Sequence, residues 1–251
     1  MLVQCPYIKI LSTPFVGAGA ETGNGSTMGS LFANQTNNPY PNDVWGASQP
    51  YKWSSSDTTY SSITTYFPKT LEKIIINRQT AIPAYAFQNM TGIIEIELIE
   101  ASSIGELAFY NCDTLKTVSM DNVSTMGDRV FEECDRLESI TLPALLTSIG
   151  NKAFYDCRGL KEVIVPEGVT TVGDYAFYNC YSLESISLPG VTEIKTYSFS
   201  QCTRLQEVLI PNTVLIGNYA FQNANRLTAI SIPSVTKLGS YAFQNCQSLV
   251  N

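Results

Sequence analysis

The residues of this chain that could carry out chemistry are its seven cysteines, which could act as nucleophiles or bind a soft metal. Cys180 lies in the stretch GDYAFYNCYSLESISLP, close to Asp174, Tyr175 and Asn179, and this set resembles a reactive thiol with polar neighbours. The 251 residues include no histidine. Its absence excludes the usual Cys-His and Ser-His-Asp forms of catalysis and every zinc site that contains histidine. No CxxC pair is present either, so the elements around the cysteines decide their role.

The cysteines belong to a tandem repeat that is best aligned on a phenylalanine recurring every 22 or 23 residues. The copies are centred on Phe87, Phe109, Phe131, Phe154, Phe177, Phe199, Phe221 and Phe243. Cysteine stands three residues after phenylalanine (+3) in six copies, Met90 and Ala224 replace it in the other two, and Cys5 fits the same position of a partial copy. Because only small size and apolar character are kept there, we expect free, buried thiols rather than disulfides or reactive groups.

Two spacings coexist in each unit. The small residue at −1, the phenylalanine at 0, the cysteine at +3 and a leucine at +6 have helical spacing, which predicts a short helical turn. Aliphatic residues at +9 and +11 alternate as in a strand, and a proline at +12 ends it. One unit cannot bury its own apolar face, whereas stacked units can. The sequence therefore predicts a solenoid.

The unit IG-x-x-AF-x-x-C-x-x-L-x-x-[IV]-x-[ILV]-P resembles the BspA-like leucine-rich repeat of bacterial surface proteins, over residues 69–251. This resemblance implies an α/β solenoid, a right-handed leucine-rich-repeat array with a parallel sheet on one face and short helical turns on the other. It also implies a cell-surface or secreted protein that binds host or microbial partners.

Three segments follow from the repeat pattern. Residues 1–14 fit a partial repeat, residues 15–68 form an insertion, and residues 69–251 form the solenoid. The chain opens and closes inside a repeat, so we expect it to be a piece of a longer protein that carries any export signal elsewhere. The insertion is rich in Gly, Ser, Thr and Asn yet contains both tryptophans, so we expect it to pack on the solenoid.

The insertion and the sheet are two candidate binding surfaces. The aromatic side chains of the insertion could stack on a sugar, anchor a protein partner, or form a local mini-core. Those at issue are Tyr40, Trp45, Tyr51 and Trp53. On the sheet, positions +8 and +10 point outward and form either a solvated face or a binding groove. This face is mostly Ser and Thr, with scattered carboxylates at Glu95, Glu97, Glu162 and Glu207.

Two further patterns remain. Tyrosines stand two residues before the phenylalanine and are expected to stack into a ladder along the short helices, with a ligand-binding stripe as the alternative; they are Tyr85, Tyr175, Tyr197, Tyr219 and Tyr241. Asn-x-Ser/Thr sequons could carry glycans in a secreted eukaryotic protein, or arise from composition alone; they begin at Asn24, Asn34, Asn89 and Asn122.

Composition limits the function. The net charge of −7 and the charged fraction of 15% disfavour nucleic acid and anionic membrane as partners, and no apolar run is long enough to span a bilayer. We therefore expect a non-catalytic interaction or adhesion module without metal or cofactor, extracellular or on a cell surface, that binds a protein or glycan on another cell or matrix. The alternatives are a carbohydrate-binding domain of a larger secreted protein and a structural spacer.

Overall fold

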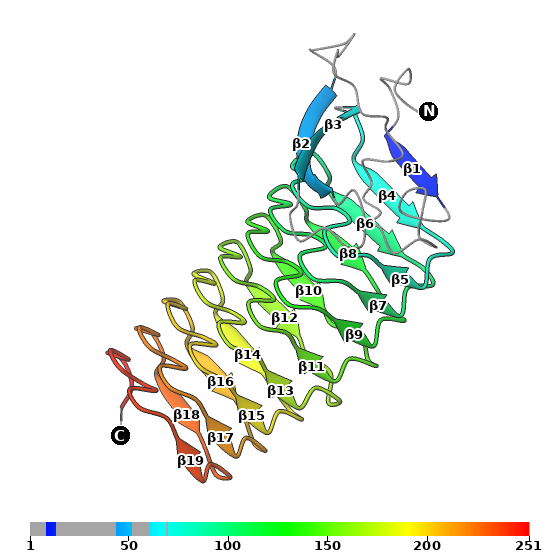
Figure 1. Ribbon diagram of the computed structural model, residues 1–251. Helices are drawn as coiled ribbons and strands as arrows, with labels where there is room; N and C mark the ends of the chain where they lie inside the picture. The colour runs from blue at the N-terminus through cyan, green and yellow to red at the C-terminus, as the bar shows by residue number, and fades with distance from the viewer. Residues whose placement is uncertain (1–8, 14–43, 52–60, 69, 251) are drawn as a thin grey trace.

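The computed structural model describes residues 9–13, 44–51, 61–68 and 70–250, and it folds the repeats into a solenoid of parallel strands, with β1 and β19 near opposite ends (Figure 1). Each repeat contributes one coil. The predicted solenoid of 22- or 23-residue units is thereby confirmed.

The first strand of each coil covers positions +8 to +10 or +11 and forms one side of the solenoid. One parallel sheet has the order β1-β4-β6-β8, with β1 (Ile10–Thr13), β4 (Lys73–Ile76), β6 (Glu95–Leu98) and β8 (Thr117–Ser119). The row continues as β10-β12-β14-β16-β18, with β10 (Ser139–Thr141), β12 (Glu162–Ile164), β14 (Ser185–Ser187), β16 (Glu207–Leu209) and β18 (Ala229–Ser231). We call the outward side of this row the main sheet face.

A second, shorter strand in each coil forms a further parallel row, where the sequence predicted one sheet only. One sheet consists of β5 (Ala81–Ile82), β7 (Ser103–Ile104) and β9 (Thr125–Met126). The other consists of β11 (Ser148–Ile149), β13 (Thr171–Val172), β15 (Glu193–Ile194), β17 (Leu215–Ile216) and β19 (Lys237–Leu238). The aliphatic residue at −5 ends each of these strands, and most copies are buried, as Val172 is.

The core is a set of columns that run along the solenoid. The phenylalanine rings stack from coil to coil with centroids 5.0 to 5.4 Å apart, and Phe177 is fully buried between Phe154 and Phe199. Burying one such side chain stabilises the fold by about 1.5–3 kcal/mol, and each aromatic pair adds about 0.5–1.5 kcal/mol. The aliphatic positions +9 and +11 are also buried, as at Val163 and Val165.

The segment that was predicted to be a short helical turn is not a helix, so that part of the prediction is wrong. In every coil the residues at −2 and +2 have positive φ, for example 57° at Tyr175 and 60° at Asn179, and an α-helix does not accommodate such residues. Three N–H groups of this segment donate to carbonyls of the next coil, at 2.7 to 3.1 Å from Tyr175, Phe177 and Asn179. The N–H groups between them donate to carbonyls three residues earlier. Consecutive three-residue turns produce the same side-chain spacing as a helix, while leaving N–H groups for the neighbouring coil.

Within residues 15–68, the structure describes one antiparallel pair. β2 (Val44–Tyr51) and β3 (Ser61–Pro68) run side by side, with Val44 opposite Pro68 and Tyr51 opposite Ser61. The expected packing of this insertion on the solenoid stays a prediction. In the described parts of the chain, no helix has the length and apolar character needed to cross a membrane.

Candidate interaction surface

The cysteine thiols are core groups. Their side chains are buried and unpaired with one another at Cys112, Cys134, Cys157, Cys180 and Cys202. Each Sγ donates a hydrogen bond to the carbonyl oxygen of the phenylalanine in the preceding coil, at 2.9 to 3.2 Å. The prediction of free, buried thiols is confirmed for these five. Cys246 makes the same bond to Phe221 at 3.1 Å but is half-buried, and Cys5 lies outside the described residues.

Burial makes these thiols poor nucleophiles, because desolvation disfavours the charged thiolate. It raises the pKa of Cys112 and that of Cys202 to about 12, and it raises the pKa of Cys180 well above the usual value. Across the described residues, no group of three or more Cys, Asp or Glu side chains is arranged to hold a metal ion.

The polar neighbours of Cys180 in the sequence belong to ladders that run between coils. Asp174 Oδ1 accepts a hydrogen bond from the N–H of Thr196 at 2.9 Å, and Asn179 Nδ2 donates to Asp156 Oδ1 at 2.7 Å. The ring of Tyr175 stacks on that of Tyr197. Each of the three side chains is thus used for contact with an adjacent coil. Together with the buried thiol, they form no catalytic constellation.

The acidic residues on the N-terminal part of the main sheet face are already paired. Lys73 Nζ lies 2.7 Å from Glu95 Oε1 and 3.1 Å from Glu97 Oε2. Lys73 donates hydrogen bonds to these two carboxylates, and these bonds raise its pKa, with Glu95 as the larger contributor; the negative charge of both carboxylates raises it further. The sequence placed Glu95 and Glu97 on the outward face correctly. It did not reveal that a lysine one strand away binds both.

The C-terminal part of the main sheet face combines exposed carboxylates with exposed aliphatic side chains. Glu162 and Glu207 are exposed, and neither makes an ion pair with any residue that the structure describes. Two positions further along the same strands, Ile164 is 54% exposed and Leu209 is 51% exposed. The alternation of buried and exposed residues along each strand therefore confirms that +8 and +10 face outward.

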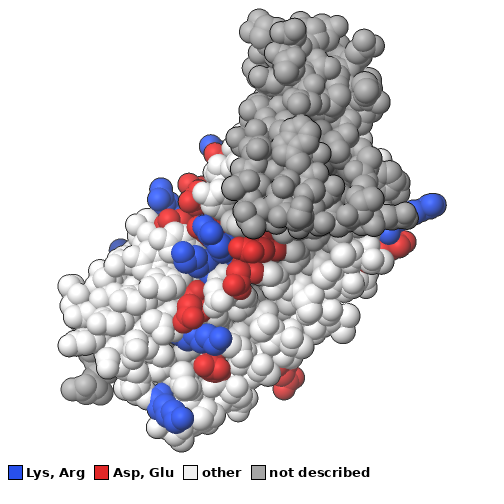
Figure 2. Space-filling model, in the orientation of Figure 1, with Lys and Arg blue, Asp and Glu red and all other residues white. Residues whose placement is uncertain are grey.

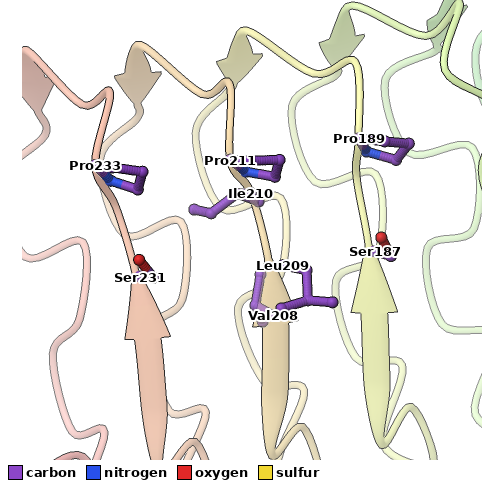
Figure 3. A pocket seen from close by; sticks show the side chains of 8 residues that line it. All are labelled: Ser187, Pro189, Val208, Leu209, Ile210, Pro211, Ser231 and Pro233. Carbon is purple, nitrogen blue, oxygen red and sulfur yellow. The ribbon is translucent and has the colours of Figure 1, made fainter.

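A shallow hollow of about 280 Å³ lies beside Leu209 on this part of the face. Figure 3 shows Leu209 on β16 between Ser187 on β14 and Ser231 on β18, and it shows the prolines at +12 aligned at the ends of the strands. The small serines leave space on both sides of the leucine. Further lining comes from Pro189, Val208, Ile210, Pro211 and Pro233. The site can thus accept an apolar side chain of a partner.

Charged side chains form a row along the solenoid on the face shown in Figure 2, with both signs present and large uncharged areas beside the row. One pair that links adjacent coils is Lys161 Nζ with Glu138 Oε2, at 2.7 Å. The hydrogen bond and charge of Lys161 lower the pKa of the Glu138 carboxyl. Because the two signs are mixed, this face has no extended field of a single sign.

The tyrosine ladder is confirmed for four consecutive coils. The rings of Tyr175, Tyr197, Tyr219 and Tyr241 stack with centroids 4.7 to 5.2 Å apart. Lys152 takes the same position one coil earlier, and its Nζ lies 5.8 Å from the centroid of the Tyr175 ring. This ladder lies on the turn segments, where the sequence placed it along helices. Stacking explains the tyrosines without a ligand.

The aromatic residues of the insertion remain untested as a site. Tyr40 and Trp53 lie outside the described residues. Trp45 and Tyr51 lie on β2, whose backbone alone is described. Among the sequons, Asn24 and Asn34 also lie outside the described residues. Asn89 Oδ1 accepts a hydrogen bond from Asn111, and the exposed Asn122 donates to the Ile99 carbonyl.

Comparison with known proteins gives a consistent result. A family model described as a BspA type leucine rich repeat region matches residues 62–146 and 124–250, in six copies. The leucine-rich repeat protein of T. pallidum is 24% identical, with a TM-score of 0.58 over 71% of this chain and 78% of that chain. A leucine-rich repeat protein from Bacteroides ovatus is 19% identical, with a TM-score of 0.58 over 83% of this chain and 80% of that chain.

A third similar structure is a leucine rich cell surface protein from Faecalibacterium prausnitzii. It is 25% identical, with a TM-score of 0.55 over 71% of this chain and 59% of that chain. A search of curated proteins found no match.

Proposed function

The chain belongs to the BspA-type leucine-rich repeat family, and from this membership we propose that it is a non-catalytic interaction or adhesion module that binds protein partners of a host or of another microbe. The family indicates a protein-interaction module. A location on the cell surface or outside the cell is part of the proposal, and the printed name of the similar cell surface protein from F. prausnitzii supports it.

The observation that carries the proposal is the main sheet face between β12 and β18. Ile164 and Leu209 expose more than half of their surface there, and Leu209 lines a hollow together with serines and prolines of the neighbouring strands. Binding energy at protein interfaces concentrates in a few side chains that fill pockets of the partner. Aliphatic anchors next to a hollow on a rigid stack of coils meet that requirement, and the unpaired carboxylates of Glu162 and Glu207 can add charge complementarity at the rim.

The non-catalytic part of the proposal is supported by the state of the thiols. All five described cysteines between residues 112 and 202 are buried, donate hydrogen bonds, and have a raised pKa. A protonated, inaccessible thiol is a poor nucleophile. The same hydrogen bond, from Sγ to a phenylalanine carbonyl of the preceding coil, recurs at all six of these cysteines, including Cys246, and this indicates a role in joining coils.

The proposal can be tested by measuring binding of the purified chain to immobilised fibronectin, laminin and type I collagen, and to cultured epithelial cells before and after trypsin treatment. We expect binding to at least one of these surfaces, and we expect trypsin to abolish binding to cells. The double variant Ile164→Ser with Leu209→Ser should weaken this binding about 10-fold or more, because both anchors are lost. Leu145→Ser is the matched control, since Leu145 is 59% exposed but lies outside the strands of the main sheet face.

Two results would contradict the proposal. Binding that survives trypsin but is lost after glycosidase treatment would favour a carbohydrate-binding domain. No binding to any of these surfaces would favour a structural spacer.

A further inference from the structure

Four outward side chains on neighbouring strands alternate between large and small. Ile164 on β12 pairs in register with Ser187 on β14, Ser187 pairs with Leu209 on β16, and Leu209 pairs with Ser231 on β18. All four are exposed. Neighbouring strands lie about 4.8 Å apart, so the two large side chains stand about 9.6 Å apart with a gap between them. We call these four residues the alternating row.

The alternating row is complementary to itself. A two-fold axis parallel to the strands, lying between the two faces and midway between β14 and β16, would place Leu209 of one copy over Ser187 of the other and Ile164 over Ser231. Each large side chain would then enter a gap, and the symmetry would repeat every contact. The hollow beside Leu209 is the gap that a second copy would fill (Figure 3).

The charges of the face are compatible with this arrangement. The two-fold axis keeps the strand direction between copies, so the position +8 of one copy faces the position +8 of the other. Glu162 would lie over Ala229 and Glu207 over Ser185, so no carboxylate would lie directly over another.

We infer that the alternating row is a homotypic docking surface, through which two copies of this chain pack their main sheet faces together. The inference rests on the proposed function, because it assigns a partner to the same face. A foreign partner would need no such alternation, whereas a second copy requires large and small residues at equal spacing about one axis.

Sedimentation velocity of the purified chain over a wide concentration range tests the inference. We expect a reversible monomer–dimer equilibrium in the wild type. Leu209→Ser removes a large side chain and should weaken the dimer about 30-fold, because half of a leucine side chain is no longer buried in each of two copies. Ser187→Leu fills the gap and should weaken the dimer by a similar factor. All variants should retain the wild-type circular dichroism spectrum and melting temperature, since both positions are exposed.

The decisive measurement combines the two changes. In the double variant Leu209→Ser with Ser187→Leu, the large and small residues exchange places, and dimerisation should return to within about threefold of wild type. An equimolar mixture of the two single variants should likewise form a heterodimer, because every leucine then faces a serine. Leu145→Ser should leave the equilibrium unchanged.

Three outcomes would overturn the inference: a wild-type chain that stays monomeric, a tighter dimer on Ser187→Leu, or single variants that neither combination restores. A tighter dimer would indicate unspecific apolar association. A monomeric chain that still binds the matrix proteins or cells would refute this inference and leave the proposed function intact. If the chain dimerises but binds none of those surfaces, this inference would stand and the proposed function would be refuted.

Discussion

Raising the pH should destabilise this protein through its buried thiols. Above pH 9 an unfolded cysteine loses its proton, whereas the pKa of folded Cys112 is raised by burial to about 12. The unfolded state then binds fewer protons than the folded state, so the free energy of unfolding falls as the pH rises. The stability that this difference in pKa affects is fully present below pH 9, and it is lost progressively as the pH rises toward the pKa of the folded thiol.

The magnitude follows from the difference in pKa between the two states. With a value of 9.0 for the unfolded thiol and about 12 for the folded one, Cys112 lowers the free energy of unfolding by about 1.4 kcal/mol at pH 10 relative to pH 8. Cys202, whose pKa burial also raises to about 12, adds a similar cost, so the two thiols together cost about 3 kcal/mol, a large part of the stability of many domains. The assay is urea denaturation monitored by circular dichroism at pH 8, 9 and 10.

Variants in the +3 position isolate this effect from the titration of lysines and tyrosines. Cys202→Ala should reduce the loss between pH 8 and pH 10 by about 1.4 kcal/mol, although it costs about 1 kcal/mol at pH 8 through lost packing and the lost hydrogen bond to the Phe177 carbonyl. Ala224→Cys places a thiol where the fold has a buried alanine and should increase the loss by about 1.4 kcal/mol. Equal losses in the wild type and both variants would refute the reasoning.

Two further changes test the packing and the backbone of the coils. Phe177→Ala should lower the free energy of unfolding by about 4 kcal/mol in urea denaturation, because a fully buried ring that stacks on two others is lost. Phe243→Ala should lower it by about half as much, because Phe243 is only partly buried. Equal losses for the two variants would argue against this account. Gln201→Asn should raise the melting temperature and increase the free energy of unfolding by about 1 kcal/mol, because Gln201 has φ of 66° and asparagine tolerates that conformation better. An unchanged or lower melting temperature would contradict this expectation. Gln206→Asn is the control at an exposed position.

Much of the fold could be predicted because the signal is repeated. The positions of Phe177, Cys180 and Leu183 inside the core, and those of Ser185 and Ser187 outside, follow from side-chain periodicity within one unit. Several aligned units then reveal which properties each position keeps. Conformation was harder to predict than burial, because the same spacing suits a helix and a series of turns. A left-handed residue such as Tyr175 carries no signal of its conformation, whereas the asparagine at +2 in five of the eight copies is such a signal.

The candidate surface was predicted only in part. Outward positions such as Glu162 and Glu207 were identified from the alternation along their strands. The pairing of Glu95 with Lys73, by contrast, joins residues 22 positions apart and depends on the register between coils. The anchors Ile164 and Leu209 were visible in the sequence as outward aliphatic residues. Their importance emerged once the structure showed the hollow beside Leu209.

The sequence by itself determined the repeat, the core positions and the strand of the main sheet, because these depend on a local periodicity that recurs in every unit. Only the tertiary structure decided which atoms meet across coils. Cys180 shows the difference. Its burial followed from the +3 position, which Ala224 occupies in another repeat. Its hydrogen-bond acceptor, the carbonyl of Phe154, lies 26 residues earlier in the chain. Contacts of this kind are set by how one coil stacks on the next, and side-chain spacing within a unit contains no information about them.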